Sequence, residues 1–462
     1  MNVLILSTVW GIVMMFAGLW LKKNSHATSL AIAGMILLLL GNIGDGAGVV
    51  LTRDTFGMLD FTGYYEIFIA VLLVATLLYF ILSGKDIEAV GHSSFDFYAL
   101  IFFVITGTCL CASYSNLLML FLGIEILSIP LYILTGADKK NLKSNEASLK
   151  YFLMGSFSTG ILLLGIALIY GESGSFLLKP PPLPFAFEGM ALPGMTQVGV
   201  LLVMFALAFK VSAAPFHFWT PDVYDGAPTP FTSFMATIVK AAGFIAFFRL
   251  MAEGYGEGTL SWGLAMSVLI GLTLLVGNLT AVFQMSVKRM MAYSSIAQAG
   301  FMLIAVYTPN EHGHDGLLIY TASYCLATIG VFAVLGKLKD PSLEGFNGLA
   351  KKEPLTAFVT AICLLSLAGI PLTGGFLGKF YMLSALVDVG HFWLAILAIL
   401  CAAISAYYYF RVIQAMYFKE GNPVLVAPVG AGWKVALLGL TLLIILLGVV
   451  PYGLMINWQM FY

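Results

Sequence analysis

Residues 117–134 read LLMLFLGIEILSIPLYIL, an apolar run with a single carboxylate, Glu125, near its middle. A helix crosses the hydrocarbon layer of a bilayer in about 20 residues, so this run predicts a transmembrane helix. An ionised group at mid-bilayer costs about 2.5–3.5 kcal/mol on insertion scales, which makes Glu125 a candidate functional residue.

The rest of the chain has the same apolar character. Of its 462 residues, 60% are apolar and 10% are charged, and the mean hydropathy is +0.97. Soluble domains are typically about 25% charged, so this composition excludes a soluble enzyme, a disordered chain and a nucleic-acid binder. The five cysteines form no CxxC motif, and no phosphate-binding glycine motif occurs. We therefore expect no cofactor and no metal ion on this chain.

About fourteen apolar runs of membrane-spanning length follow one another along the sequence. They centre near 3–21, 27–44, 64–83, 95–112, 115–135, 147–170, 194–214, 228–251, 260–283, 290–308, 316–336, 355–387, 391–417 and 434–457. These runs do not alternate between polar and apolar residues, as the strands of a membrane β-barrel would. The sequence therefore predicts an all-α polytopic membrane protein of about 14 transmembrane helices.

The basic residues predict the orientation of these spans. Sixteen of the 22 Lys and Arg residues lie in or beside odd-numbered connections, and only Arg53 and Lys179 lie in even-numbered ones. Cytoplasmic loops carry the excess of basic residues, so the odd-numbered connections are expected in the cytoplasm. Both termini then lie outside, on the face of the membrane opposite the cytoplasm.

Three lysines join Glu125 inside apolar runs: Lys210, Lys240 and Lys379. Each lysine on its own could extend its amine to the membrane surface or form a structural pair. Four central charges of both signs on four different spans instead favour a shared polar pathway that handles protons. Lysine suits this task because desolvation favours its neutral form, whereas a nearby carboxylate favours its charged form.

A Glu–Lys pair of this kind can act as a proton switch. Two unit charges about 7 Å apart interact by about 2.4 kcal/mol at an effective dielectric constant of about 20. Moving the carboxylate away would therefore change the proton affinity of the lysine more than tenfold.

Two spans contain stretches that predict broken helices, residues 210–221 and residues 369–378, where proline and glycine interrupt the apolar pattern. Discontinuous helices with an adjacent charge are a transporter device. The breaks fall in spans seven and twelve, five spans apart, which predicts two inverted five-helix repeats. The predicted division is helices 1–3 (1–94), the first repeat (95–252), the second repeat (258–420) and helix 14 (421–462).

Three further residues are candidates for a proton relay: His217, Lys288 and Tyr293. A histidine titrates near neutrality, but His217 could equally be structural. Lys288 could form the inward mouth of the pathway or anchor the chain at the cytoplasmic surface. The run Tyr407–Tyr409 could add a hydroxyl group to a water chain or could serve packing.

Three motifs resemble the antiporter-like subunits of respiratory complex I. They are FKVSAAPFHFWTPDVYDGAPTP (209–230), KRMMAYSSIAQAG (288–300) and GIPLTGGFLGKF (369–380). The resemblance covers essentially the whole chain, and the first motif is long enough to be specific. It implies fourteen helices, two inverted repeats and broken helices 7 and 12.

The resemblance also implies a role for each buried charge. Glu125 and Lys210 would pair between helices five and seven, Lys240 would bridge from helix eight, and Lys379 would serve the exit side. Lys379 and the short C-terminal end separate this chain from two other branches of the family, of which one has a glutamate at that position and one has a long lateral helix. Gln298 departs from the pattern, because many relatives have histidine there.

As the resemblance implies, the chain would translocate protons in the membrane arm of a proton-pumping NADH:quinone oxidoreductase. The expected partners are the antiporter-like subunit M, the small subunits K and J and the lipid bilayer, with no nucleic acid. NADH and quinone would be bound by other subunits. The alternatives are a subunit of an Mrp-type cation/proton antiporter, the equivalent membrane subunit of a hydrogenase complex, and a structural anchor without conduction.

Overall fold

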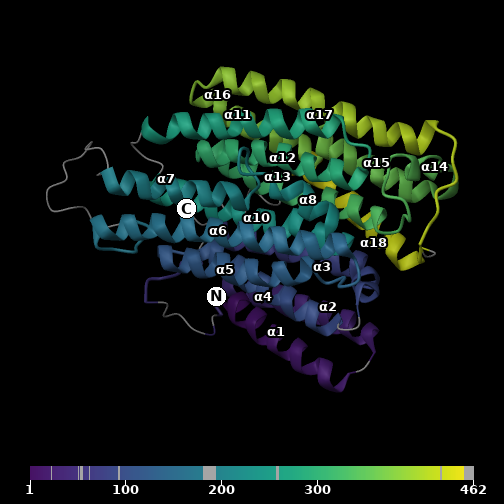
Figure 1. Cartoon of the computed structure of the whole chain (residues 1–462), viewed down its shortest axis with the longest axis horizontal. Coiled ribbons are helices and arrows are strands. Elements are labelled where there is room, and N and C mark those ends of the chain that lie inside the picture. The colour runs from purple at the N-terminus through teal and green to yellow at the C-terminus, as the bar shows by residue number, and fades with distance from the viewer. Residues whose placement is uncertain are drawn as a thin grey trace.

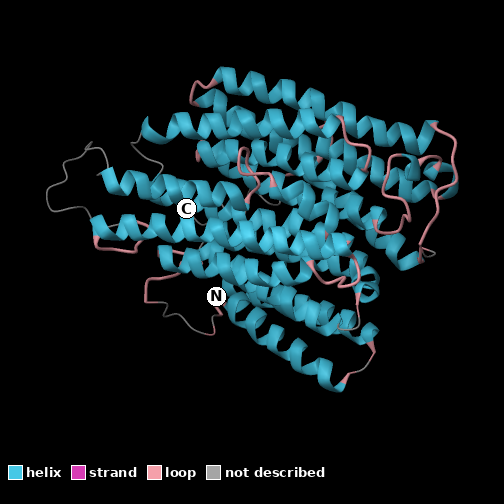
Figure 2. Ribbon diagram, in the orientation of Figure 1, coloured by secondary structure: helices cyan, strands magenta, loops and turns pink. Residues whose placement is uncertain are grey.

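A computed structural model describes residues 1–21, 23–49, 51, 56–61, 63–91, 94–179, 194–255, 260–426 and 429–451. These residues form helices joined by short connections, and no strand occurs among them (Figure 2). The prediction of an all-α chain is confirmed. The predicted connection between spans six and seven lies partly outside the described residues, as does the end of the predicted run 434–457.

The helices follow one another in the order of the predicted runs. Their bounds are α1 (Asn2–Trp20), α2 (Asn24–Gly46), α3 (Tyr64–Val90), α4 (Ser94–Ser113), α5 (Leu117–Thr135), α6 (Leu142–Ser173), α7 (Gly194–Lys210), α8 (Trp219–Gly226), α9 (Thr229–Phe234), α10 (Lys240–Arg249), α11 (Leu260–Val282), α12 (Val287–Tyr307), α13 (Glu311–Leu335), α14 (Leu349–Lys352), α15 (Pro354–Ala368), α16 (Gly374–Asp388), α17 (Phe392–Phe418) and α18 (Ala431–Val449). Two π-helical segments, η1 (Met235–Val239) and η2 (Leu250–Tyr255), continue α9 and α10.

Within the described residues, twelve helices are long and apolar enough to cross a membrane. One of them is the continuous segment Thr229–Tyr255. The predicted runs 194–214 and 355–387 contain shorter apolar helices, Gly194–Lys210 and Pro354–Ala368. A polytopic membrane protein is therefore confirmed, whereas the count of fourteen spans stays a prediction.

The helices run side by side from α1 at one edge through α6 and α7 to α16 and α17 at the other, with α11 next to α17 rather than in chain order (Figure 1). The last helix, α18, returns to pack against α3, α13, α15 and α16. Trp433 near the start of α18 donates a hydrogen bond from its indole nitrogen to the carbonyl oxygen of Leu82 on α3, at 2.9 Å. The C-terminal helix thereby ties the late helices to the early ones.

Small residues let α5 lie close to α4. A Cβ atom on Gly107 of α4 would lie 2.6 Å from the backbone nitrogen of Leu127 and 2.8 Å from the carbonyl oxygen of Gly123. Such close backbone approach at glycine is typical of helix pairs in membranes. It fixes α5, and with it Glu125, against the core of the chain.

Two apolar segments leave the helical conformation where the sequence predicts breaks. The first gap separates α7 from α8, and Ser212 within it has a φ of 66°. The second separates α15 from α16, and there Gly369 and Leu372 have φ values of 86° and 71°. Positive φ is uncommon for residues other than glycine, so Ser212 and Leu372 mark local backbone strain at both breaks.

Candidate functional site

Glu125 and Lys210 approach each other through a serine on α5. Lys210, the last residue of α7, donates a hydrogen bond from Nζ to Ser128 Oγ at 2.9 Å. Ser128 lies one helical turn after Glu125, whose Oε1 accepts a hydrogen bond from Thr159 Oγ1 of α6 at 2.7 Å. Among the ion pairs of the described residues, none shorter than 4.0 Å joins Glu125 to Lys210. Lys210 therefore reaches α5 at Ser128, whose hydroxyl in turn donates to the carbonyl oxygen of Ile124, and forms no direct ion pair with Glu125 within the described residues.

The break after α7 leaves backbone groups that other atoms satisfy. Trp219 at the start of α8 donates its indole N–H to the carbonyl oxygen of Phe209 at 3.1 Å. The backbone N–H of Ala214 donates to Thr273 Oγ1 on α11 at 2.9 Å. Irregular backbone at membrane depth requires such partners, so the break is built into the protein interior.

Lys240 lies at the centre of the described helices and is 1% exposed. It is the first residue of α10 and follows directly on the π-helical segment η1, a local widening that often marks functional sites. Its Nζ donates to both the carbonyl oxygen and Oγ of Ser295 on α12, each at 2.9 Å. The ring of Tyr224 lies 5.9 Å from the same amine, so an aromatic face further stabilises the cation.

Lys379 uses the carbonyl oxygens that the second break exposes. Because α15 ends at Ala368, its last carbonyl groups have no partner within the helix. Lys379 Nζ donates to the carbonyl oxygens of Leu367 at 2.8 Å and Ala368 at 3.3 Å. The ring of Phe301 on α12 lies 4.5 Å from the amine, and the side chain is almost fully buried.

A hydrogen-bonded cluster on α12, α13 and α17 shares the Leu367 carbonyl oxygen with Lys379 and includes Ser294, the neighbour in sequence of the Lys240 partner Ser295. Gln298 Nε2 donates to the carbonyl oxygen of Leu367 and to the hydroxyl of Tyr409, both at 3.0 Å. Tyr320 donates to Gln298 Oε1, and Tyr409 shares a hydrogen bond with Ser294. We call these four side chains, Ser294, Gln298, Tyr320 and Tyr409, the α12 polar cluster.

The three predicted relay residues are not joined to this cluster by hydrogen bonds within the described residues. Lys288 donates from Nζ to the carbonyl oxygens of Asp225 and Ala227, at the C-terminal end of α8, where a cation is favourable. His217 is buried and stacks on Phe218, with ring centroids 4.6 Å apart. Tyr293 is half-buried and packs against the apolar core.

Sequence reasoning missed several hydrogen-bond partners of the site: Thr159 donates to Glu125, Ser295 accepts from Lys240, and Tyr320 donates to Gln298. Thr159, Ser295 and Tyr320 are ordinary residues of apolar helices, and no signal in the sequence singles them out. Gln298 was noted only as a departure from a family pattern, although a buried amide in an apolar helix needs partners. The residues of the Tyr407–Tyr409 run have different surroundings, because Tyr409 belongs to the α12 polar cluster whereas Tyr407 is 59% exposed.

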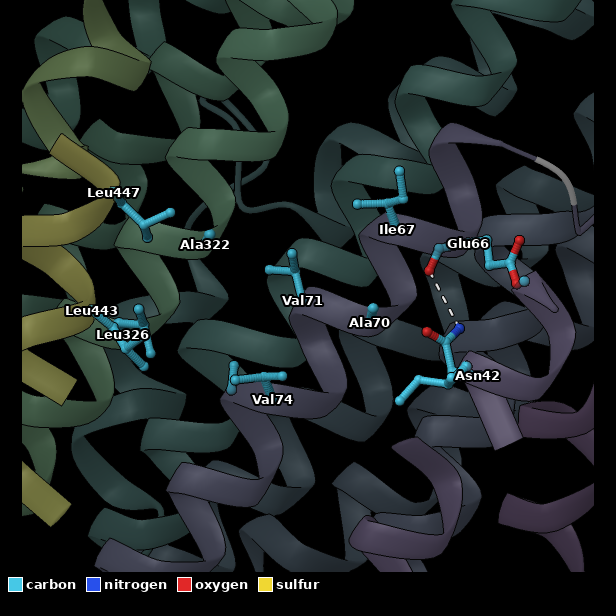
Figure 3. A pocket seen from close by; sticks show the side chains of 13 residues that line it. Asn42, Glu66, Ile67, Ala70, Val71, Val74, Ala322, Leu326, Leu443 and Leu447 are labelled. Carbon is cyan, nitrogen blue, oxygen red and sulfur yellow. Dashed lines mark hydrogen bonds between the residues drawn. The ribbon is translucent and has the colours of Figure 1, made fainter. Parts of the chain in front are cut away.

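None of these residues lines the apolar groove that opens elsewhere on the described helices. It has a volume of about 490 Å³ and opens between α2, α3, α13 and α18 (Figure 3). Val71, Val74, Leu326 and Leu447 line it, and Glu66 lies at one end. None of the predicted site residues lines this groove, so the candidate site is the set of polar groups described above. Among the described residues, no group of three His, Cys, Asp or Glu side chains could hold a metal ion.

Comparison with known proteins places this arrangement in a family. The family model described as "NADH:quinone oxidoreductase/Mrp antiporter, TM" matches residues 114–405. NADH-quinone oxidoreductase subunit N of Cytophaga hutchinsonii is 41% identical over 460 residues, which cover 98% of each chain.

Two solved structures have the same fold. A chain of respiratory complex I from Thermus thermophilus with bound aureothin is 32% identical, covers 97% of both chains and has a TM-score of 0.83. A chain of the Mrp complex from Dietzia sp. DQ12-45-1b is 18% identical, covers 100% of this chain and 97% of that chain, and has a TM-score of 0.84. The second likeness concerns the fold alone.

Proposed function

Since the chain belongs to the NADH:quinone oxidoreductase/Mrp antiporter family, we propose that it translocates protons in the membrane arm of an NADH:quinone oxidoreductase. In this role it corresponds to subunit N of its relatives. Quinone reduction occurs elsewhere in that complex and drives the translocation. The chain itself carries no redox cofactor in this proposal.

The observation that carries the proposal is the buried amine of Lys240. Its hydrogen-bond partners are the carbonyl and hydroxyl oxygens of Ser295, and no carboxylate forms an ion pair with it within the described residues. A structural lysine at this depth would be expected to pair with an acidic group. An amine held by neutral oxygen atoms instead can exist charged or neutral, as a proton carrier must.

The four charged residues give the proposed route its direction. Glu125 and Lys210 load a proton near the first helix break, Lys240 carries it at the centre and Lys379 passes it outward at the second break. His217, Lys288 and Tyr293 serve as relay residues on the cytoplasmic side. Water molecules complete the route wherever the described side chains are too far apart for direct transfer.

Helix packing supports the proposed inverted repeats, residues 95–252 and 258–420. In the first, α4 packs on α5 and α6 packs on the broken pair α7 and α8. In the second, α11 packs on α12 and α13 packs on the broken pair α15 and α16. Both repeats therefore use the same order of neighbours around their breaks.

The proposed location is a bacterial inner membrane, with both termini on the periplasmic side. The proposed neighbours are the antiporter-like subunit M and the small subunits K and J. Helices α1, α2 and α18 are the least buried of the candidate spans, with 28%, 33% and 22% of their apolar windows covered. They therefore offer apolar surface for lipid or for neighbouring subunits.

The second candidate function is a subunit of an Mrp-type antiporter, and the hydrogenase subunit is a third. Sequence identity favours the NADH:quinone oxidoreductase subunit, because the chain of the Mrp complex is 18% identical whereas the chain of complex I is 32% identical. The structural-anchor alternative gives no role to the four charged residues within apolar runs, Glu125, Lys210, Lys240 and Lys379.

Purification of the tagged chain from its native membrane tests the proposal. We expect it to copurify with NADH:quinone oxidoreductase activity. In inside-out vesicles of the same membrane, NADH oxidation should acidify the vesicle interior. Lys240→Leu should retain NADH oxidation but lose most of the acidification, whereas the exposed Lys339→Leu should retain both. Copurification with cation/proton exchange that needs no NADH would contradict the proposal and support the Mrp alternative.

A further inference from the structure

We infer that Gln298 and Tyr409 are positioning residues that couple the protonation of Lys379 to the hydroxyl groups beside Lys240. The inference rests on the proposed function and adds a link between two of its proton carriers. It begins from the orientation of one buried amide. Gln298 is fully buried, so its hydrogen bonds are made with protein atoms.

The Leu367 carbonyl fixes which way the Gln298 amide points. A carbonyl oxygen can only accept hydrogen bonds, so the NH₂ end of the amide must face it. The opposite orientation would place two acceptors, Gln298 Oε1 and the Leu367 carbonyl oxygen, against each other. The position at which α15 ends thus determines the orientation of the Gln298 side chain on α12.

This orientation fixes the direction of the remaining hydrogen bonds. Gln298 Oε1 must accept, so the Tyr320 hydroxyl donates to it. Gln298 Nε2 donates its second proton to Tyr409, which must accept. The proton of Tyr409 is then available for Ser294 Oγ, its other partner in the α12 polar cluster. The next residue, Ser295, receives the amine of Lys240.

Lys379 and Gln298 share the same acceptor at the other end of the cluster. A charged amine makes a shorter and stronger hydrogen bond than a neutral one. The Leu367 carbonyl oxygen therefore interacts more strongly with Lys379 when the lysine is protonated, and is more available to Gln298 when the proton has left. Loss of the proton is thus transmitted to the Gln298 amide and from there to Tyr409 and Ser294.

Gln298 cannot itself be a carrier, because an amide neither gains nor loses a proton in the physiological range. Its role is to connect the Leu367 carbonyl oxygen to the Tyr409 hydroxyl by donating a hydrogen bond to each. Removing the Tyr409 hydroxyl should interrupt the link while leaving the volume of the side chain almost unchanged.

The first test compares Tyr409→Phe with Tyr407→Phe in the whole complex reconstituted in liposomes. Tyr407 is an exposed neighbour on the same helix and provides a matched control. We expect the ratio of protons pumped to electrons transferred to fall at least twofold for Tyr409→Phe and to stay unchanged for Tyr407→Phe. A wild-type ratio for assembled Tyr409→Phe would overturn the inference.

The second test uses Gln298→His and a pH profile. Neutral imidazole offers one donor and one acceptor, whereas imidazolium offers two donors and no acceptor for Tyr320. The ionisable groups facing the cluster are Tyr320 and Tyr324 of α13, Tyr408 and Tyr409 of α17 and Lys379 of α16, with Lys240 of α10 one step further. We expect the pumping ratio of Gln298→His to be near wild type at pH 8 and at least twofold lower at pH 6.

A purely structural role for Gln298 predicts the same ratio at both pH values, and this result would also overturn the inference. Lys379→Met separates the inference from the proposed function. If Lys379→Met pumps normally, the proposed route fails. If Lys379→Met loses pumping while Tyr409→Phe retains it, only the inferred link fails.

Discussion

Gln298 and Lys379 donate hydrogen bonds to the same atom, the carbonyl oxygen of Leu367, from distances of 3.0 and 2.8 Å. That oxygen is available because α15 ends at Ala368. The end of a helix thus supplies an acceptor for a buried amine without adding an acidic side chain. At the first break the amine of Lys210 instead meets a side-chain oxygen, Ser128 Oγ.

The pairing of α5 with α7 predicts the effect of removing either charge. Glu125→Ala and Lys210→Ala should each lower proton pumping severalfold while the complex still assembles, because an apolar helix inserts more easily than one with a charge. Proton pumping by purified complex in liposomes checks this, with the exposed Lys139→Ala as the control. Wild-type pumping by both fully assembled variants would contradict the proposed switch.

The contact between α4 and α5 predicts a stability difference between two glycines. Gly107→Ala would place a Cβ atom 2.6 Å from the Leu127 nitrogen, so the helices must separate. Overpacking of this kind typically costs about 1–3 kcal/mol, and the thermal midpoint should fall. Gly160→Ala on α6 meets nothing within 4 Å and should not change it. Equal midpoints for the two variants, measured by thermal unfolding of the purified complex, would show that the close approach is unimportant.

The distribution of basic residues predicts the sidedness of two connections. The described cysteines are buried, so single cysteines introduced at exposed positions can be labelled against a low background. Lys140→Cys should react with a membrane-impermeant maleimide only from the cytoplasm, and Lys179→Cys only from the periplasm. Reaction of both residues from one side would show that a span between them is missing or miscounted.

Arg249 is a buried cation that the proposed route does not use. Its guanidinium donates to the carbonyl oxygen of Ala112 at 2.9 Å, lies 3.3 Å from Glu253 Oε2 and stacks 4.1 Å from the ring of Tyr65. Removing one member of a buried charge network typically costs about 3–5 kcal/mol. Arg249→Leu should therefore reduce the amount of assembled complex on a native gel severalfold.

Arg249→Lys should rescue this loss only in part, because lysine lacks the planar fork that reaches several acceptors at once. A normal yield of complex for Arg249→Leu would mean that the network adds little to stability. A full rescue by lysine would mean that charge alone is required.

The fold class and the four charged residues within apolar runs could be predicted from the sequence, because a bilayer demands long apolar helices and penalises each ionised group within them. The ends of α7 and α15 were predictable for a similar reason, since proline and glycine interrupt apolar runs at 210–221 and 369–378, whereas the two broken transmembrane helices stay a prediction. These features depend only on the local sequence and on the lipid bilayer that surrounds it. That Lys240 and Lys379 are buried whereas Glu125 and Lys210 are half-buried depends on packing.

The partners of the buried charges could not be predicted, because they depend on which helices meet. Ser128 accepts a hydrogen bond from Lys210 only because the end of α7 lies near that turn of α5, and Ser295 accepts from Lys240 only because α12 faces α10. A serine in an apolar helix usually bonds its own backbone, so its sequence context carries no signal of a second partner. Tyr409 illustrates the same limit, since only packing distinguishes it from Tyr407.

The proton-to-electron ratio of Lys379 variants in the reconstituted complex tests the central claim most directly, namely that buried lysines carry protons through this chain. Lys379→Glu retains a titratable group and should preserve part of the pumping. Lys379→Arg should lose pumping, because arginine does not release its proton in proteins.

The decisive variant is Lys379→Met, which matches lysine in length but cannot titrate. With NADH oxidation retained, its proton-to-electron ratio should fall well below those of wild type and Lys379→Glu, while the exposed Lys339→Met should keep the wild-type ratio. Equal ratios for Lys379→Met and wild type would show that Lys379 carries no proton and would contradict the account.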